Sequence, residues 1–110
     1  MPNKKRDPFI AIADPTRREI IHMLSQNEMR LNDIAGQFEQ SRPAISKHIK
    51  ILEECGMVQI VPSGRERYCY LDASALKKIS EWIKFYEKFW DTKLDRLGNY
   101  LKKNHSKDKK

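Results

Sequence analysis

The chain has 110 residues and a formal net charge of +7, and both numbers limit what it can be. A chain of this length holds one domain with one hydrophobic core. The charge lies mostly in the ends, because residues 1–7 contribute +2 and residues 102–110 contribute +4, which leaves +1 for the body. Terminal lysines are as typical of a solubilising tail as of a nucleic-acid contact, so the net charge alone does not indicate a nucleic-acid partner. We expect a flexible basic N-terminus at 1–7, one domain at 8–101 and a lysine-rich tail at 104–110.

The sequence shows neither an export signal nor a membrane anchor. No apolar run approaches the roughly 18–20 residues that cross a bilayer, and the basic start is not followed by the apolar stretch of a secretory signal. Cys55 and Cys69 are fourteen positions apart and form no CxxC pair. We therefore expect a cytoplasmic protein with reduced thiols and no membrane partner.

Two helices are predicted at the start of the body. A short apolar helix covers residues 8–13 and ends before Asp14, whose side chain can cap the next helix, while Pro15 suits the first helical position. The second helix is about three turns long and places Ile20, Ile21 and Leu24 on one face.

A second pair of helices follows, with a turn between them. Apolar side chains from Leu31 to Phe38 recur with i, i+3, i+4, i+7 spacing, which predicts a short third helix. Ser41 then caps a fourth helix over 42–55, and Gly56 ends it because glycine tolerates left-handed backbone angles.

The periodicity changes after this fourth helix. Residues 57–61 and 65–71 alternate as strands do, around a turn at 62–64, which predicts a β-hairpin with a charged tip. Asp72 then caps one long helix from about 73 to 103. This order of elements predicts a mainly α fold with a small β-hairpin, namely a winged helix-turn-helix followed by a long C-terminal dimerisation helix.

The fourth helix carries basic and small polar side chains on the side that the apolar residues leave exposed. A DNA major groove about 12 Å wide admits one helix, whose N-terminal half reads the bases. Positions 41–50 hold no acidic residue, and the hairpin arginines suit the sugar-phosphate backbone. There are two alternatives. The helix could be an ordinary surface helix with a solvated basic face, and the charges at the hairpin tip could serve only to prevent the strand edge from pairing with another strand. Helix and hairpin together favour double-stranded DNA as the partner, contacted by Ser41, Arg42, Pro43, Ser46, Lys47, His48, Lys50, Arg65 and Arg67.

Three runs of residues, in this order, resemble the ArsR-type (ArsR/SmtB) bacterial repressors. They are Ala11-Ile12-Ala13-Asp14-Pro15-Thr16-Arg17-Arg18, the run SRPAISKHIKIL that starts at Ser41, and Gly56-Met57-Val58. The similarity spans about residues 8–101. It implies a dimeric transcriptional repressor that inserts the helix from Ser41 into the major groove of a pseudo-palindromic operator and releases DNA when an effector binds.

The resemblance fails at the metal site of the family's metal sensors. Those members carry a cysteine-rich run in the helix before the turn, where this chain has Leu31-Asn32-Asp33-Ile34-Ala35 without a sulfur ligand. A zinc site needs four converging ligands. The candidates are scattered along the sequence: His22, His48, His105, Cys55 and Cys69. We expect a metal-independent repressor without a cofactor, and we expect the two cysteines to be small packing residues. A metal-responsive or redox-responsive repressor is the alternative.

The long last helix has more apolar surface than the small domain can cover. Apolar residues recur at spacings of three and four from Leu76 to Leu101, and Phe85 widens this seam. Such a stripe is more often core than a ligand site, so we expect a second copy to cover it in a two-fold homodimer. The expected interface residues are Phe9, Ile10, Trp82, Ile83, Tyr86, Phe89, Trp90, Leu94, Leu97 and Leu101. An aromatic pocket there could accept an apolar effector, whose identity the sequence does not indicate.

Other functional classes have less support. An enzyme is not indicated, because the sequence has no paired carboxylates, phosphate-binding glycine loop or nucleophile and base that the fold would bring together. A winged helix can also serve as a protein-interaction module with an idle basic face. The two uses differ in the role of Arg42 and Lys47, which only DNA reading requires. A repressor that binds its own promoter would be an autorepressor.

Overall fold

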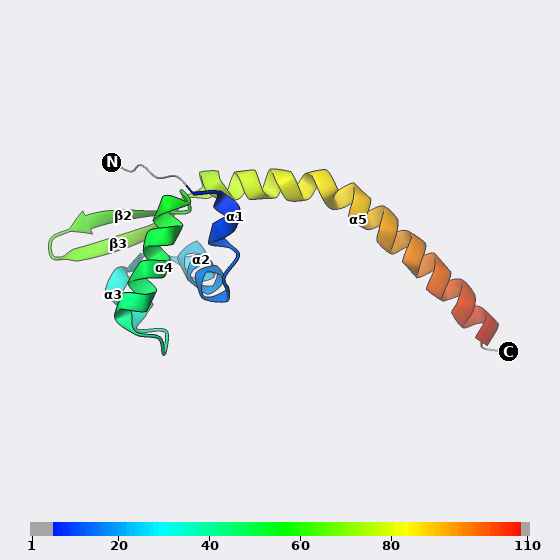
Figure 1. The fold of residues 1–110 in the computed structure, drawn as a ribbon, viewed down its shortest axis with the longest axis horizontal. Helices are drawn as coiled ribbons and strands as arrows, with labels where there is room; N and C mark the ends of the chain where they lie inside the picture. The colour runs from blue at the N-terminus through cyan, green and yellow to red at the C-terminus, as the bar shows by residue number, and fades with distance from the viewer. Residues whose placement is uncertain (1–5, 109–110) are drawn as a thin grey trace. The chain divides into compact units, whose positions relative to one another are not determined.

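The computed structural model describes residues 6–108, with side chains as far as Lys103. Its elements are α1 (Pro8–Ala11), α2 (Pro15–Gln26), β1 (Met29–Arg30), α3 (Leu31–Ala35), α4 (Arg42–Glu54), β2 (Val58–Ser63), β3 (Glu66–Leu71) and α5 (Ala73–Asp108). This is the expected mainly helical winged helix-turn-helix with a long C-terminal helix (Figure 1). The chain divides into two compact units, one ending at Ile79 and one starting at Ser80, and each is described by itself. Residues 1–5 of the expected N-terminus (1–7) and residues 109–110 of the expected tail (104–110) lie outside the described part of the chain.

Helices α1, α2 and α4 all begin with a capping side chain and an early proline. Asp14 Oδ2 accepts a hydrogen bond from the backbone N–H of Arg17 at 3.1 Å, and Ser41 Oγ accepts one from that of Ala44 at 3.3 Å. Asp7 does the same at the start of α1. Because the first N–H groups of a helix have no partner inside it, these caps determine where each helix begins, as the sequence predicted for Asp14 and Ser41.

The core of the first unit lies between the helices and the sheet. Ile45, Ile49 and Leu52 of α4 are completely buried, as their helical spacing predicted. The remaining buried residues are Ala11, Ile20, Leu24, Leu31, Ile34, Ala35, Cys55, Met57, Val58, Cys69, Ala75 and Ile79. The last two belong to α5, so its first two turns pack in this core.

The sheet has three strands in the order β1-β3-β2, one more than the expected hairpin. β1 pairs antiparallel with β3, with Met29 opposite Cys69. A strand of two residues is too short to show periodicity, so the sequence pattern did not predict it. α3 follows β1 directly and ends at Ala35, earlier than the predicted end near Phe38.

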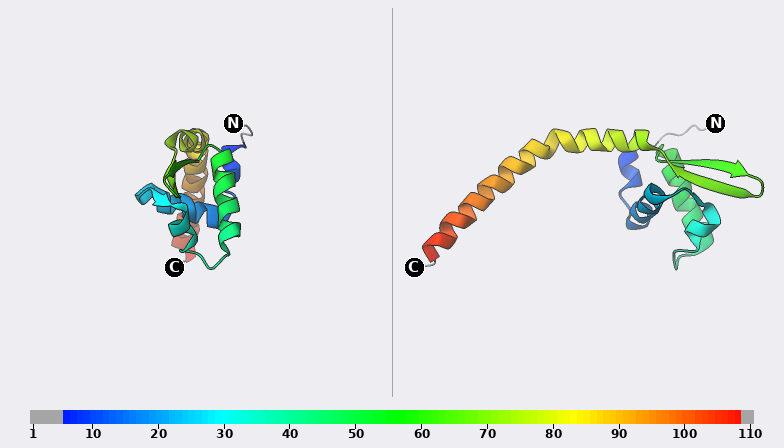
Figure 2. Two further views of the ribbon diagram at one scale, coloured as in Figure 1. Left: turned by 90° about the vertical axis from the view of Figure 1, so that its left-hand side faces the viewer. Right: turned by 180° about the vertical axis from the view of Figure 1, so that it is seen from behind.

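The β2–β3 hairpin, or wing, turns later than predicted. Ser63 pairs with Glu66, so the turn consists of Gly64 and Arg65. Gly64 has a φ of 63°, a left-handed angle that glycine adopts without steric cost. Pro62 lies inside β2, where it is tolerated because β2 is an edge strand. The wing extends beyond α3 and α4 (Figures 1 and 2).

Helix α5 begins at the predicted cap and runs past its predicted end near Lys103 to Asp108. Asp72 Oδ1 accepts hydrogen bonds from the hydroxyl and backbone N–H of Ser74 at 2.7 and 3.0 Å, and Asp72 Oδ2 accepts one from Gln59 at 2.8 Å. The pKa of Asp72 lies below its ordinary value because the carboxylate accepts hydrogen bonds from the Ser74 hydroxyl, the Gln59 amide and the Ser74 N–H. Burial has a smaller effect and raises the pKa. In the second unit, every described side chain from Ser80 to Lys103 is exposed in the single chain.

Candidate nucleic-acid interface

The outer side of α4 carries most of the side chains that the sequence predicted to contact DNA. Arg42, Pro43, Lys47 and Lys50 are exposed, and Ser46 is half-buried. Positions 43, 46, 47 and 50 follow i, i+3, i+4, i+7 spacing, so they form one stripe along the helix. The capping of α4 at Ser41 places this stripe at the N-terminal half of the helix, the part that reads bases when a helix enters the major groove.

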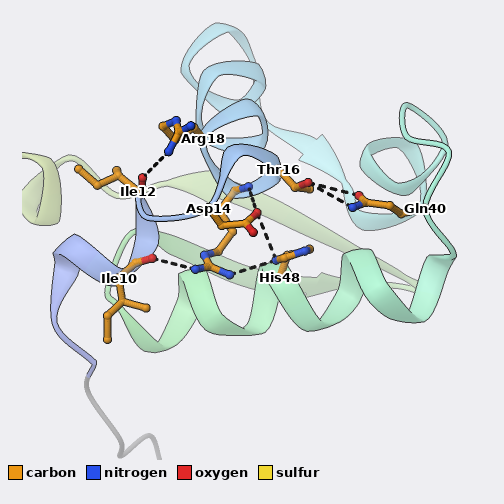
Figure 3. A network of polar contacts seen from close by, with 8 residues as sticks. Ile10, Ile12, Asp14, Thr16, Arg18, Gln40 and His48 are labelled. Carbon is orange, nitrogen blue, oxygen red and sulfur yellow. Dashed lines mark hydrogen bonds and ion pairs between the residues drawn. The ribbon is translucent and has the colours of Figure 1, made fainter.

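His48 does not lie on the outer side of α4, where the sequence predicted it. Its side chain is 20% exposed, and its Nδ1 lies 3.1 Å from Arg17 Nη1 and 3.9 Å from Asp14 Oδ2 (Figure 3). His48 therefore faces α2 and the loop before it. The structure brings it to a polar contact between helices, while Lys47 and Lys50 on either side of it point outward into solvent.

The run from Asp14 to Arg18 connects three parts of the first unit. Arg17 Nη2 donates to the Ile10 carbonyl at 3.0 Å, and Arg18 Nη1 donates to the Ile12 carbonyl at 2.8 Å (Figure 3). These bonds attach α1 and the following loop to the start of α2. The hydrogen bond from Arg17 to His48 then attaches the same point to α4.

Thr16 and Gln40 make a further contact between α2 and the loop before α4. The Thr16 hydroxyl lies 3.4 Å from Gln40 Oε1, to which it can donate, and 3.3 Å from Gln40 Nε2, from which it can accept (Figure 3). Because Gln40 immediately precedes the α4 cap, this contact helps to hold the entry into α4.

Asp14 is a charged acceptor at the centre of these contacts. Burial opposes its ionisation, but the N–H of Arg17, the charge of His48, the N–H of Thr16 and the charge of Arg17 together hold the pKa of Asp14 below its ordinary value. The negative charge at the N-terminus of α2 also suits the dipole of that helix.

The wing arginines lie at the hairpin tip, as expected. Arg65 occupies the turn, Arg67 lies in β3 opposite Pro62, and both side chains are exposed. Glu66 lies between them in the sequence, and its Oε2 lies 3.9 Å from Arg30 Nη1.

A polar cavity of about 320 Å³ joins α3, α4 and the wing. It is lined by Leu31, Asn32, Arg42, Ser46, Arg65, Glu66 and Arg67. Four of these were predicted DNA-contacting residues, and they come from two segments more than fifteen positions apart in the sequence. The structure therefore places the basic start of α4 and the basic wing tip beside one another.

Asn32 is a member of this group that the sequence did not indicate. Its Oδ1 accepts a hydrogen bond of 2.6 Å from Arg42 Nε, which fixes one edge of the guanidinium. Asn32 is a single exposed amide on the short helix α3, and only its polarity just before the α4 turn could have suggested a role.

Both cysteines lie in the core, as expected for packing residues. Burial raises the pKa of the Cys55 thiol, and burial together with the charge of Glu53 raises that of Cys69 to about 11. Thiols with such pKa values form little thiolate, which is the reactive form.

The described part of the chain holds neither a cluster of metal ligands nor a helix that could span a membrane. Between residues 6 and 103, where side chains are described, no three His, Cys, Asp or Glu side chains gather as metal ligands do. No helix in that range is both long and apolar enough to span a bilayer.

Comparison with known proteins identifies the family. A model of the arsR family of bacterial regulatory proteins matches residues 14–59, the segment that holds α2, α3 and α4. The transcriptional repressor SdpR of Bacillus subtilis is 36% identical over 75 residues, which cover 68% of this chain and 83% of SdpR. The chain belongs to the arsR family.

A further similar protein and a similar crystal structure agree with this assignment. The HTH-type transcriptional regulator Rv2034 of Mycobacterium tuberculosis is 32% identical over 80 residues, 73% of this chain and 72% of Rv2034. A crystal structure described as a possible transcriptional regulator for arsenical resistance has a TM-score of 0.70 and 36% identity, and the match covers 86% of this chain and 95% of that chain. As an arsR-family protein, the chain is a DNA-binding transcriptional regulator and not an enzyme.

Proposed function

We propose that the chain is a homodimeric, metal-independent repressor that binds a pseudo-palindromic DNA operator through α4 and the wing. The convergence of Arg42 and Ser46 with Arg65 and Arg67 around one cavity carries this proposal. With α4 in a major groove, the wing tip would lie at the adjacent sugar-phosphate backbone, where arginine contacts add affinity and fix the register. The reading residues are then Ser41, Arg42, Pro43, Ser46, Lys47 and Lys50, with Arg65 and Arg67 on the backbone.

His48 has a supporting role in this proposal. Its contacts with Arg17 and Asp14 hold α4 against α2, so the side chain contributes to the position of the reading helix. It does not need to reach DNA for α4 to do so.

The exposed apolar face of α5 supports dimerisation. Ten large apolar side chains between residues 82 and 101 are 37–77% exposed in the single chain. A continuous apolar stripe of this kind marks an interaction surface, and a second copy related by a two-fold axis is its usual partner. Phe9 and Ile10 of α1 are the proposed contribution of the first unit. A two-fold dimer presents two reading helices about one DNA turn, roughly 34 Å, apart, which matches a palindromic site.

The mode of regulation is proposed from three features. The segment Leu31–Ala35 has no sulfur ligand, and Cys55 and Cys69 are buried with raised pKa values, which argues for a signal other than a soft metal or thiol oxidation. The similar protein SdpR is named a repressor. We extend repression to this chain and propose its own promoter as one target. The domain spans residues 8–101, with the dimerisation helix from about 73.

Selection of bound duplexes from a random-sequence pool tests this function. The full-length protein should enrich a short sequence repeated in inverted orientation at half-sites about 10 base pairs apart. The double variant Arg42→Ala/Lys47→Ala should lose this enrichment while retaining weak, salt-sensitive binding. A second double variant, Lys78→Ala/Lys84→Ala, removes two exposed lysines of α5 and should select the same sequence as the unaltered protein. Unchanged selection by Arg42→Ala/Lys47→Ala would contradict the assignment of α4 to the groove and would favour a protein-interaction module.

A further inference from the structure

Helix α5 carries a second row of side chains beside its apolar seam. In the second unit, the seam consists of six apolar residues at spacings of three and four: Ile83, Tyr86, Trp90, Leu94, Leu97 and Leu101. The residue before each of them is turned by about 100° around the helix, because one turn has about 3.6 residues. These six preceding residues form a row that we call the aromatic stripe: Trp82, Phe85, Phe89, Lys93, Arg96 and Tyr100. All of them are exposed in the single chain.

The seam and the aromatic stripe together are wider than the face that one partner helix covers. A helix packed on one partner has an apolar face about 100° wide, and the two rows span roughly 180°. Phe85 and Tyr100 lie outside the proposed dimer interface and are 77% and 64% exposed, while Trp82 and Phe89 lie at its edge. A dimer through the seam therefore leaves exposed rings beside it.

The two sides of the seam differ in charge. The aromatic stripe holds two cations, Lys93 and Arg96, and no acid. The residues that directly follow the seam residues hold three acids and two lysines: Lys84, Glu87, Asp91, Asp95, Gly98 and Lys102. Among the residues whose side chains are described, neither Lys93 nor Arg96 forms an ion pair with a carboxylate. The aromatic stripe is thus a positive surface that lacks an anionic partner within the described chain.

Contacts within α5 hold part of the aromatic stripe in place. Lys93 Nζ lies 5.3 Å from the centroid of the Phe89 ring, which is a cation–π contact. The Phe85 ring meets the Tyr86 ring edge-on, with the centroids 4.9 Å apart. Side chains that are already ordered lose less conformational freedom when a partner binds. At about 1.5 Å per residue, the aromatic stripe is about 27 Å long, or about five helical turns.

We propose that the aromatic stripe binds an amphipathic helix of another protein. Its apolar side chains pack between the rings, and its acidic side chains pair with Lys93 and Arg96. A helix laid along α5 matches the spacing of three and four residues in the stripe.

The charges of α5 distinguish this partner from two others. A further copy of the chain, related by a two-fold axis, brings its own Lys93 and Arg96 to the same stripe, where like charges repel. An anionic membrane surface contacts both sides of the seam at once, and the side that holds Glu87, Asp91 and Asp95 opposes this. An acidic helix that docks from one side contacts only the positive row.

Two synthetic helical peptides of about 20 residues test this proposal. Both carry leucine at i, i+3, i+4 and i+7, and the flanking positions are glutamate in one peptide and lysine in the other. Isothermal titration calorimetry measures their affinity for the full-length protein. The acidic peptide should bind with one copy per chain, and the basic peptide should bind at least about tenfold more weakly. Equal affinity for both peptides, or binding of neither, would overturn the proposal.

Reversal of the charge on the aromatic stripe should exchange the preference. Lys93→Glu/Arg96→Glu should weaken binding of the acidic peptide about tenfold and strengthen binding of the basic one. Lys84→Glu/Lys102→Glu makes the same change in charge on the other side of the seam and should retain the original preference. Equal effects of the two double variants would show that the peptide binds elsewhere.

Removal of one ring tests the apolar part of the same surface. Phe85→Ala should weaken binding of the acidic peptide about tenfold, as expected for an aromatic anchor. In sedimentation velocity, this variant should keep the mass of the unaltered protein. If Phe85→Ala lowers that mass, the aromatic stripe contacts a further copy of the chain and the proposal is wrong.

Vesicles made of phosphatidylglycerol and phosphatidylcholine test the membrane as a partner. They should not retain the protein in a flotation assay. Retention that Lys93→Glu/Arg96→Glu abolishes would assign the aromatic stripe to an anionic membrane and overturn the proposal. None of these experiments contains DNA, so their outcome is independent of the proposed operator binding.

Discussion

Arg17 of α2 and His48 of α4 are joined by a hydrogen bond of 3.1 Å between Arg17 Nη1 and His48 Nδ1. A guanidinium group can only donate, so Arg17 is the donor in this contact. The same guanidinium donates to the carbonyl of Ile10 at 3.0 Å. One arginine side chain therefore links α1, α2 and the helix proposed to read DNA.

Replacement of His48 by leucine should destabilise the fold without removing a DNA contact. His48→Leu keeps much of the side-chain volume but leaves an Arg17 N–H without its acceptor, which should lower the free energy of unfolding by about 1–3 kcal/mol in urea titrations. The sequence selected from random duplexes and the salt dependence of binding should stay the same. Lys47→Ala is the matched control on the outer side and should show the reverse pattern. A changed operator preference in His48→Leu would return His48 to the set of base-reading residues.

Acid should destabilise the protein through Asp14 and Asp72. Their folded-state pKa values lie below the ordinary value, so in acid the unfolded chain binds more protons and stability rises with pH. This contribution is complete above the unfolded pKa of about 3.9 and is lost as the pH falls through the lower folded values. Asp72→Asn retains a capping oxygen for α5 but cannot ionise, so its urea midpoint should depend less on pH between about 6 and 2. Asp91→Asn, on exposed α5, should follow the unaltered profile; equal profiles for all three proteins would contradict the role of Asp72.

Both thiols should be inert in the folded protein. Since burial raises the pKa of Cys55 and of Cys69, the latter to about 11, a disulfide reagent such as DTNB should react slowly in buffer and quickly in denaturant. Hydrogen peroxide should leave operator affinity unchanged, and Cys69→Ala should respond as the unaltered protein does. Rapid titration of one thiol under native conditions, with loss of DNA binding, would favour a redox-responsive repressor.

Trp90→Ala should dissociate the proposed dimer. Trp90 is 63% exposed in the single chain, so its removal should leave the first unit intact and weaken association by about 2–4 kcal/mol, the range of an interface hot spot. Sedimentation velocity at low micromolar concentration should then show monomers. Lys88→Ala, on the polar side of the same helix, should remain dimeric. If Trp90→Ala sediments as the unaltered protein does, Trp90 lies outside the interface.

The elements that a local pattern determines were predictable. Asp14, Ser41 and Asp72 cap their helices as expected, and the spacing of Ile45, Ile49 and Leu52 correctly predicted the buried side of α4. Each of these features depends on neighbours within one or two turns.

The features that depend on distant partners were not predictable. His48 lies beside the outer stripe of α4, and only Arg17, 31 positions earlier, draws it toward α2. Asn32 gains its role from Arg42, ten positions later. β1 exists because β3, almost forty residues downstream, supplies its hydrogen-bonding partners. In all three cases the deciding contact is tertiary, and the sequence near the residue carries no periodicity that marks it.

The pairing of β1 with β3 has a mechanical consequence for DNA recognition. β1 is followed without a break by α3, so the strand that carries Arg67 is hydrogen-bonded to the chain that enters the helix-turn-helix. The wing cannot hinge at its base without breaking this ladder. In the proposed DNA complex, the distance between the residues that read the groove and those that contact the backbone would therefore be set before the duplex binds, and association would spend little free energy on ordering the wing. A duplex whose groove geometry does not fit this rigid span would itself have to deform, so on this proposal the short strand makes DNA shape part of operator selection.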